Sequence, residues 1–203
     1  MAIEVDPARD ALVIVDVQND FCPRGALGVP GGDRVVPVLS RYAERFAARG
    51  APVFVSRDWH PAETSHFRDG GGVWPPHCVQ GTPGAELHAG LVLPADTTMV
   101  SKGMDPRSDA YSCFQAETED GAPFAAALGE RGVSRLFVGG LATDYCVKST
   151  VLDGVRAGFE VIVLEDAIAA VDLTPGDGER ALAEMRGVGA LLVRIDDVRW
   201  ADE

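Results

Sequence analysis

The sequence predicts a single-domain α/β fold in which a mostly parallel, six-stranded sheet carries helices on both faces. Unbroken apolar runs of strand length alternate with amphipathic segments along the chain, which is typical of parallel strands buried on both faces. The length of 203 residues matches one domain of ordinary size. No internal repeat or linker interrupts the pattern, so we expect residues 1–203 to form one domain.

Six apolar runs define the expected strands, and four amphipathic segments define the expected helices. The strands are expected at residues 11–15, 52–56, 97–101, 135–138, 160–164 and 190–193. The helices are expected at residues 33–49, 123–131, 144–157 and 176–186. Asp33 is suited to cap the first helix, and Thr143 or Asp144 the third. Residues 57–96 show little periodicity, and a loop of that length within a compact domain predicts a functional region.

The composition of the chain excludes some classes of binding partner. Lys plus Arg number 18 and Asp plus Glu number 31, so the formal net charge is −13, a field that repels nucleic-acid phosphates and anionic lipid. The first residues do not resemble a signal peptide, and no apolar run is long enough to span a bilayer. The four cysteines are scattered and are expected to be free thiols. We expect a cytoplasmic protein that binds neither nucleic acid nor membrane, and the sequence leaves a homo-oligomer open.

Reactive side chains follow four of the expected strands. Asp16 follows the first strand, Asp58 the second and Lys102 the third, while Cys146 comes shortly after the fourth. Ligands of open α/β sheets bind beyond the carboxyl ends of the strands, so these side chains are expected on one rim. A cysteine in the first turn of a helix feels the positive end of the helix dipole, which favours the thiolate. From these residues alone, a packed cysteine and a structural Asp16–Lys102 pair remain alternatives.

A metal site is expected in the long loop region. Asp58 and His60 are two residues apart, so their side chains project to one side of an extended backbone. His66 and His77 follow closely enough to fold back and complete the set. Three imidazoles and a carboxylate suit one divalent ion; the ligand set does not choose between Zn²⁺, Fe²⁺ and Mn²⁺, and Zn²⁺ is the ion that we expect. Solvent-facing histidines are the alternative, and His88 is left out of the set.

Several stretches in chain order together resemble a known family. They are Val13–Cys22, Arg57–His60, Trp74–Cys78, Lys102–Gly103, Asp109–Phe114 and Gly139–Cys146. The opening Asp-x-Gln-Asn-Asp-Phe and the closing Ala-Thr-Asp-x-Cys resemble the isochorismatase-like cysteine hydrolase superfamily. The combination of Asp-x-His with a later histidine and Trp-Pro-Pro-His resembles its nicotinamidase/pyrazinamidase branch.

The resemblance implies a role for each group of residues. The implied catalytic triad is Asp16, Lys102 and Cys146, and the implied metal ligands are Asp58, His60, His66 and His77. Phe21 and Trp74 resemble the aromatic residues that flank the substrate ring, and Tyr111 resembles a further wall of the pocket. The family's cis peptide maps to Leu141–Ala142, where it would aim the amides of Ala142 and Cys146 at an oxyanion.

The implied activity is hydrolysis of nicotinamide, and of pyrazinamide-like aromatic amides, through a cysteine thioester, with a place in pyridine-nucleotide salvage. Asp16 would accept the Cys146 proton, Lys102 would keep that carboxylate placed, and the metal would anchor the substrate ring. The alternative is another amidase of the superfamily acting on a different small amide or ureido substrate. A vinyl-ether hydrolase and an inactive binding protein are more distant alternatives.

Overall fold

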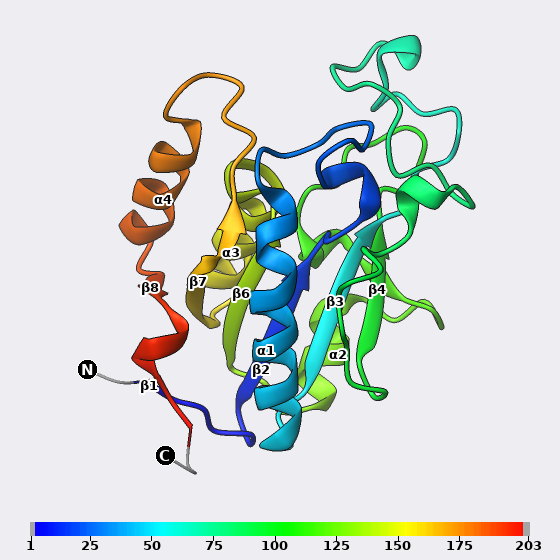
Figure 1. Cartoon of the computed structure of the whole chain (residues 1–203). Helices are drawn as coiled ribbons and strands as arrows, with labels where there is room; N and C mark the ends of the chain where they lie inside the picture. Colours follow the sequence, from blue (N-terminus) through cyan, green and yellow to red (C-terminus); the bar gives the residue numbers. More distant parts are fainter. Residues whose placement is uncertain (1–2, 201–203) are drawn as a thin grey trace.

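The computed structural model describes residues 3–200 as an α/β fold around one seven-stranded sheet (Figure 1). The six expected strands are β2 (Asp10–Val15), β3 (Val53–Asp58), β4 (Thr98–Lys102), β6 (Arg135–Leu141), β7 (Glu160–Ala169) and β8 (Leu191–Val193). They pair in parallel in the order β4-β3-β2-β6-β7-β8. The fold class expected from the sequence is therefore confirmed.

The expected number of strands in the sheet was one too low. The additional strand is β5 (Glu117–Thr118), which pairs antiparallel with the edge strand β4. A segment of two residues is too short to show an apolar pattern in the sequence, so only its pairing with β4 identifies it as a strand. A separate two-stranded sheet joins β1 (Ile3–Glu4) to β9 (Val198–Arg199), close to the two ends of the chain.

The four expected helices are present with small shifts in their bounds. They are α1 (Val35–Ala48), α2 (Phe124–Glu130), α3 (Lys148–Arg156) and α4 (Asp177–Gly187). The expected caps were wrong. Asp33 lies inside a short 3-10 turn, and no side chain caps α1. Thr143 and Asp144 belong to a π-helical turn that precedes α3, and the Asp144 carboxylate instead accepts the N–H groups of Val171 and Asp172.

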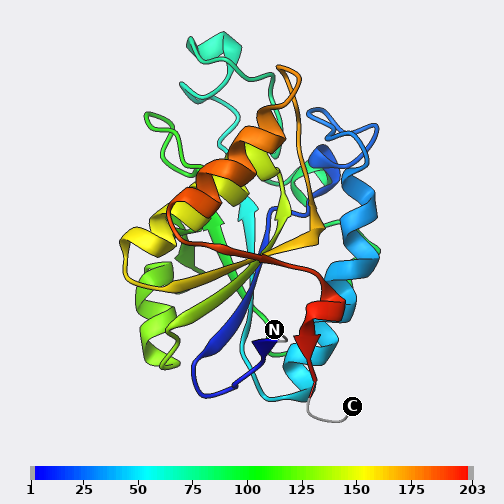
Figure 2. The ribbon, with the colours of Figure 1, turned by 90° about the vertical axis from the view of Figure 1, so that its left-hand side faces the viewer.

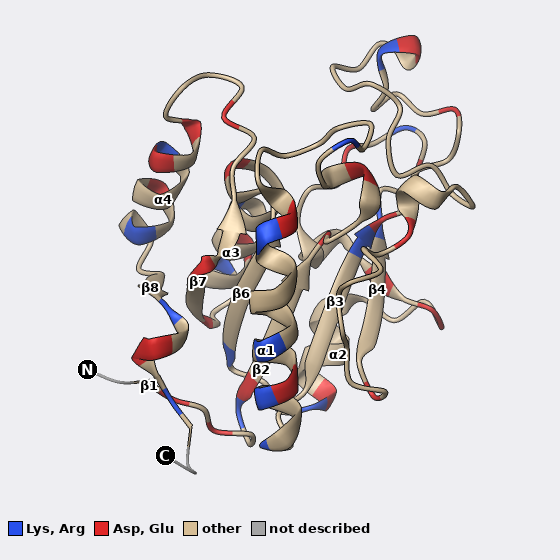
Figure 3. Ribbon diagram, in the orientation of Figure 1, with Lys and Arg blue, Asp and Glu red and all other residues tan. Residues whose placement is uncertain are grey.

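The helices divide unequally between the two faces of the sheet. Figure 2 shows α1 and the C-terminal segment on one side of the strands, with α2, α3 and α4 on the other. Every residue of β2 is buried, because both faces of this central strand are covered. Charges in β2, β3, β4 and β6 lie only at the strand ends (Figure 3). Among the described residues, no helix has the length and apolar character needed to cross a membrane.

The strand order reverses between β2 and β6. From β2 the chain adds β3 and β4 in one direction, and from β6 it adds β7 and β8 in the other. Such a switch point opens a crevice beyond the carboxyl ends of the two central strands. The residues between β3 and β4 contain only two short 3-10 helices and extend over this edge of the sheet (Figure 1).

Candidate active site and metal centre

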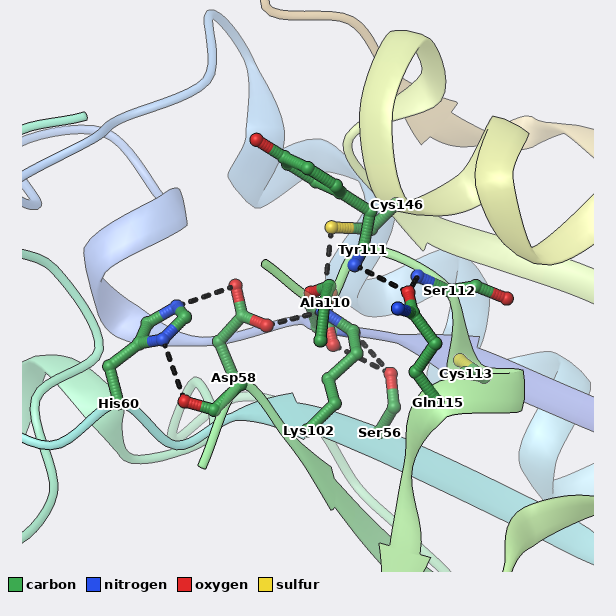
Figure 4. Close-up of polar contacts among 12 residues, drawn as sticks. Ser56, Asp58, His60, Lys102, Ala110, Tyr111, Ser112, Cys113, Gln115 and Cys146 are labelled. Carbon is green, nitrogen blue, oxygen red and sulfur yellow. Dashed lines mark hydrogen bonds and ion pairs between the residues drawn. The ribbon is translucent and has the colours of Figure 1, made fainter. Parts of the chain in front are cut away.

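The three predicted catalytic side chains meet at the switch point. The Lys102 ammonium lies 2.8 Å from Asp16 Oδ2 and 3.5 Å from Cys146 Sγ. Lys102 ends β4, Asp16 directly follows β2, and Cys146 lies in the turn between β6 and α3. All three are at most 5% exposed. Figure 4 shows the Lys102 ammonium between Asp58 and Cys146.

The Asp16 carboxylate is held by a residue that sequence reasoning missed. Ser56 Oγ donates a hydrogen bond of 2.6 Å to Asp16 Oδ1 and accepts one of 3.2 Å from the Asp16 backbone N–H. Asp16 has a φ of 49°, a left-handed conformation that is uncommon outside glycine and that often occurs at functional sites. Ser56 could be found in the sequence only as the polar member of the otherwise apolar stretch Val53–Ser56, a weak signal.

Electrostatics in the triad favour a protonated cysteine beside a charged lysine. Burial raises the pKa of the Cys146 thiol well above its usual value; Lys102 acts in the opposite direction, and the Asp16 and Asp58 carboxylates add to the rise. Burial therefore opposes the thiolate that the expected effect of the helix dipole favours. Burial favours the neutral form of Lys102, but the two carboxylates raise its pKa well above the usual value. Burial also raises the pKa of Asp16, which suits a group that accepts and returns a proton.

Asp58 connects the triad to the histidines. Its Oδ1 accepts a hydrogen bond from Lys102 Nζ, while its Oδ2 lies 3.6 Å from His60 Nε2 and 4.0 Å from His77 Nε2. Burial alone would raise the pKa of Asp58, but Lys102 brings it below its usual range. The Gln18 side chain accepts the Asp58 N–H and donates to the Asp58 carbonyl, each at 2.8 Å. The carboxylate is therefore ionised and its position is fixed from both sides.

The three predicted histidines present one nitrogen each to a common point. Their ligand atoms lie within 4.8 Å of one another. Each Nδ1 contacts a group that only accepts hydrogen bonds: the Gly103 carbonyl for His60, the Asp109 carboxylate for His66 and the Pro75 carbonyl for His77. Each Nδ1 must then carry the proton, which leaves the Nε2 lone pairs free.

This arrangement fits a divalent metal such as zinc. The buried Nε2 of His60 has no hydrogen-bond partner, which is costly unless a cation occupies that point. Burial lowers the pKa of His66, and it lowers that of His77 to about 4, so both imidazoles are neutral and able to bind a metal near neutral pH. Histidines held through Nδ1 and aimed through Nε2 are typical of metal sites.

A glycine makes room for the first of these histidines. Gly103 has a φ of 72°, and a Cβ there would lie 2.5 Å from the His60 ring. Its carbonyl oxygen is 3.0 Å from His60 Nδ1. A larger residue after Lys102 would displace the imidazole from the other ligands.

One small cavity touches Cys146 and three of the four candidate metal ligands, Asp58, His66 and His77. It is lined by Phe21, Leu27, Asp58, His66, Trp74, His77, Tyr111, Ala142, Tyr145, Cys146 and Val171. Its volume is about 30 Å³, so it suits a small ligand. Trp74 Nε1 donates to Tyr111 Oη at 2.9 Å, and the Trp74 and Tyr145 rings meet edge-on at 4.9 Å. The predicted substrate-binding residues Phe21, Trp74 and Tyr111 all lie in its wall.

The turn that carries Cys146 has the expected cis peptide between Leu141 and Ala142. Ala142 lines the cavity, as does Cys146. The Ala142 carbonyl accepts the N–H groups of Tyr145 and Val147, which holds the turn closed. That the amides of Ala142 and Cys146 form an oxyanion hole remains a prediction.

The sequence did not point to three wall residues or to one residue behind the site. Leu27 and Val171 lie in irregular segments with no periodicity. Tyr145 directly precedes the cysteine in the closing motif, so its place in the motif was an available signal. Asp109 holds His66 from 43 residues away, and nothing local to either residue indicates that pairing.

Comparison with known proteins agrees with the geometry. A profile described as the isochorismatase domain matches residues 10–197. The chain is 39% identical to a nicotinamidase from Escherichia coli (92% of this chain, 95% of the relative). It is 42% identical to a nicotinamidase/pyrazinamidase from Mycobacterium tuberculosis (90% of this chain, 97% of the relative).

Solved structures of similar proteins agree with the sequence comparison. The crystal structure of a Pyrococcus horikoshii pyrazinamidase in complex with zinc matches with a TM-score of 0.85 and 44% identity (92% of this chain, 99% of that one). PnC1 from L. infantum in complex with nicotinate matches with a TM-score of 0.87 and 34% identity (98% and 99%). The chain therefore belongs to the isochorismatase family, in its nicotinamidase/pyrazinamidase branch.

Proposed function

We propose that the protein hydrolyses nicotinamide to nicotinate and ammonia, and acts likewise on pyrazinamide. The observation that carries the proposal is the small cavity in which the Cys146 thiol and the aromatic walls meet His66 and His77, two of the three converging histidines. Relatives with 39% and 42% identity are nicotinamidases by name, and their similarity extends over about nine-tenths of the chain. Four buried free cysteines fit a reducing compartment and support a cytoplasmic location.

Asp16 begins the reaction as the general base. It accepts the Cys146 proton as the sulfur attacks the carboxamide carbon. No free thiolate has to form first, which matters because burial raises the pKa of the thiol and disfavours the thiolate. Lys102 stays charged beside both groups, so it stabilises the negative charge that moves between them. The amides of Ala142 and Cys146 are assigned to the oxyanion of the tetrahedral intermediate.

The same carboxyl group completes the cycle. Asp16 gives its proton to the departing ammonia as the C–N bond breaks, and a thioester to Cys146 remains. Water then attacks the thioester carbon, Asp16 accepts a proton from that water, and the proton returns to the sulfur as nicotinate leaves. Its raised pKa and its hydrogen bond from Ser56 suit both directions of transfer.

We assign one zinc ion to Asp58, His60, His66 and His77. A bound zinc supplies a Lewis acid at which a ring nitrogen or a water can be held. The walls contributed by Phe21, Trp74 and Tyr111 are suited to a flat aromatic ring, and the small cavity argues against a nucleotide or a peptide as substrate.

Ammonia release by the purified protein tests the proposal. Nicotinamide and pyrazinamide are supplied to the zinc-loaded protein, to the chelated protein and to the chelated protein with zinc restored. We expect release that chelation removes and zinc restores, and no release by Cys146→Ala at unchanged zinc content. A zinc-loaded protein that releases no ammonia from either amide would contradict the proposal. Turnover of a ureido compound would then favour the alternative amidase.

A further inference from the structure

Three consecutive residues on one segment each contact a different part of the site. Asp109 Oδ1 lies 2.6 Å from His66 Nδ1, the Ala110 carbonyl accepts from Lys102 Nζ at 3.4 Å, and Tyr111 Oη accepts from Trp74. The segment follows β4 and lies outside any helix or strand. The positions of one candidate metal ligand, the catalytic lysine and one wall of the cavity therefore depend on this short segment.

The Gln115 side chain holds this segment in place. Its Oε1 accepts the backbone N–H groups of Tyr111 and Ser112 at 3.0 and 3.1 Å (Figure 4). Its Nε2 donates to the Asp109 carbonyl at 3.3 Å. The Asp109 backbone is thus fixed by hydrogen bonds although the side chain of Asp109 is 55% exposed.

His66 is oriented differently from the two other histidines. The Nδ1 atoms of His60 and His77 face backbone carbonyls, whose position the fold determines. The Nδ1 of His66 faces a side-chain carboxylate from a distant loop. In the part of the chain that the structure describes, the one ion pair of Asp109 is with this imidazole, so the carboxylate has no Lys or Arg partner there.

We propose that Asp109 is a positioning residue that fixes the orientation and tautomer of His66 and thereby sets the affinity of the site for zinc. A carboxylate is a stronger acceptor than a carbonyl, so it holds the proton on Nδ1 and makes Nε2 a better ligand. Loss of such an outer partner commonly lowers metal affinity by about 10–100-fold. The inference rests on the zinc site assigned under the proposed function.

Zinc affinity measured by competition with a chromophoric chelator tests the inference. Asp109→Ala is expected to bind zinc about 10–100-fold more weakly than the wild type, and Asp109→Asn, which keeps an acceptor, less weakened than Asp109→Ala. Asp105→Ala is the matched control, because that carboxylate lies on the same loop and contacts Arg107 instead of a histidine. Equal affinity in Asp109→Ala and wild type would overturn the inference, as would equal losses in Asp105→Ala.

A measurement on the metal-free protein separates the tautomer from the metal. Nitrogen-15 NMR of the histidine rings is expected to show His66 protonated on Nδ1 in the wild type and as a mixture in Asp109→Ala, with His60 and His77 unchanged. An unchanged His66 spectrum would also overturn the inference. If the wild type binds zinc but hydrolyses neither amide, the proposed function fails while the affinity comparison still decides the role of Asp109.

Discussion

Two buried aspartates lie at opposite ends of the same strand, and only one of them belongs to the candidate site. Asp10 begins β2 and Asp16 follows its last residue, and both are fully buried. Arg135 binds both oxygens of Asp10 at 2.7 and 2.6 Å, and the Asp6 N–H adds a third bond. Asp16 instead shares Lys102 with Asp58 and lies close to the Cys146 thiol.

The comparison teaches that burial of a charge does not itself identify a functional residue. The planar guanidinium of Arg135 satisfies both oxygens of Asp10 with fixed geometry, so Asp10 is held as one half of a structural ion pair. Lys102 is a point charge between two carboxylates and a sulfur, so a proton can move among its neighbours while the ammonium stays charged. The carboxyl end of the strand faces a cavity, whereas the amino end pairs with a residue of the neighbouring strand.

The largest contrast is expected in turnover. Asp16→Asn removes the general base and should lower kcat by about 10²–10⁴-fold. Asp10→Asn should leave kcat per folded molecule unchanged, because Asp10 contacts no cavity residue. Steady-state ammonia release, corrected for the folded fraction, measures both. Equal losses in the two variants would show that the distinction drawn from their partners is wrong.

The second contrast is in stability. Lys102→Met leaves two buried carboxylates without their cation and should lower the free energy of unfolding by about 3–5 kcal/mol at neutral pH. Lys102 holds the pKa of Asp58 below its unfolded value, so this stabilisation is full above that value and disappears as the pH falls through the lowered folded pKa. In the variant, burial without Lys102 raises the pKa of Asp58, so the deficit should begin to shrink above the usual carboxyl pKa of about 4 and should become small well below it.

Urea unfolding across that pH range measures the deficit. Arg135→Met is the matched variant at the other end of β2, where one carboxylate loses its partner. Its loss should be smaller, because Arg9 remains 3.6 Å from Asp10. A deficit of Lys102→Met that stayed constant with pH would mean that the lysine stabilises by packing and not by its charge.

A third contrast concerns the thiol. Burial is the main reason that the pKa of Cys146 is raised, and the Asp16 charge adds to it. Asp16→Asn should therefore lower the pKa of Cys146 even as turnover is lost, whereas Asp10→Asn should not change it. Ultraviolet titration of the thiolate, with Cys146→Ala as the blank, measures the shift. A rise of the Cys146 pKa in Asp16→Asn would contradict the electrostatic account of the triad.

The smallest effect is expected within the cavity wall. Tyr111→Phe removes the acceptor for Trp74 Nε1, which should cost about 0.5–1.5 kcal/mol and raise KM by up to about tenfold with little change in kcat. Tyr145→Phe is the control, because Tyr145 meets Trp74 through its ring. A similar rise of KM in both variants would show that the effect does not come from the hydrogen bond between Trp74 and Tyr111.

Local patterns predicted those parts of the molecule that depend on neighbours in sequence. The six longer strands follow from unbroken apolar runs. The placement of Asp58 and Lys102 in the candidate site followed from their positions at strand ends. The two-residue strand β5, the absence of side-chain caps and the role of Ser56 depend on partners far along the chain. The Ser56–Asp16 hydrogen bond, for example, joins residues 40 positions apart.

The sequence by itself determined the order of strands and helices along the chain, the rim on which the reactive residues gather, and the chemical types of those residues. The tertiary structure alone decided which nitrogen of each histidine is free, that Cys146 rests as a thiol, and that Asp109 supports His66. Each of these depends on desolvation and on hydrogen-bond partners from other segments. Such effects act through space over a few ångströms, so positions along the chain do not reveal them.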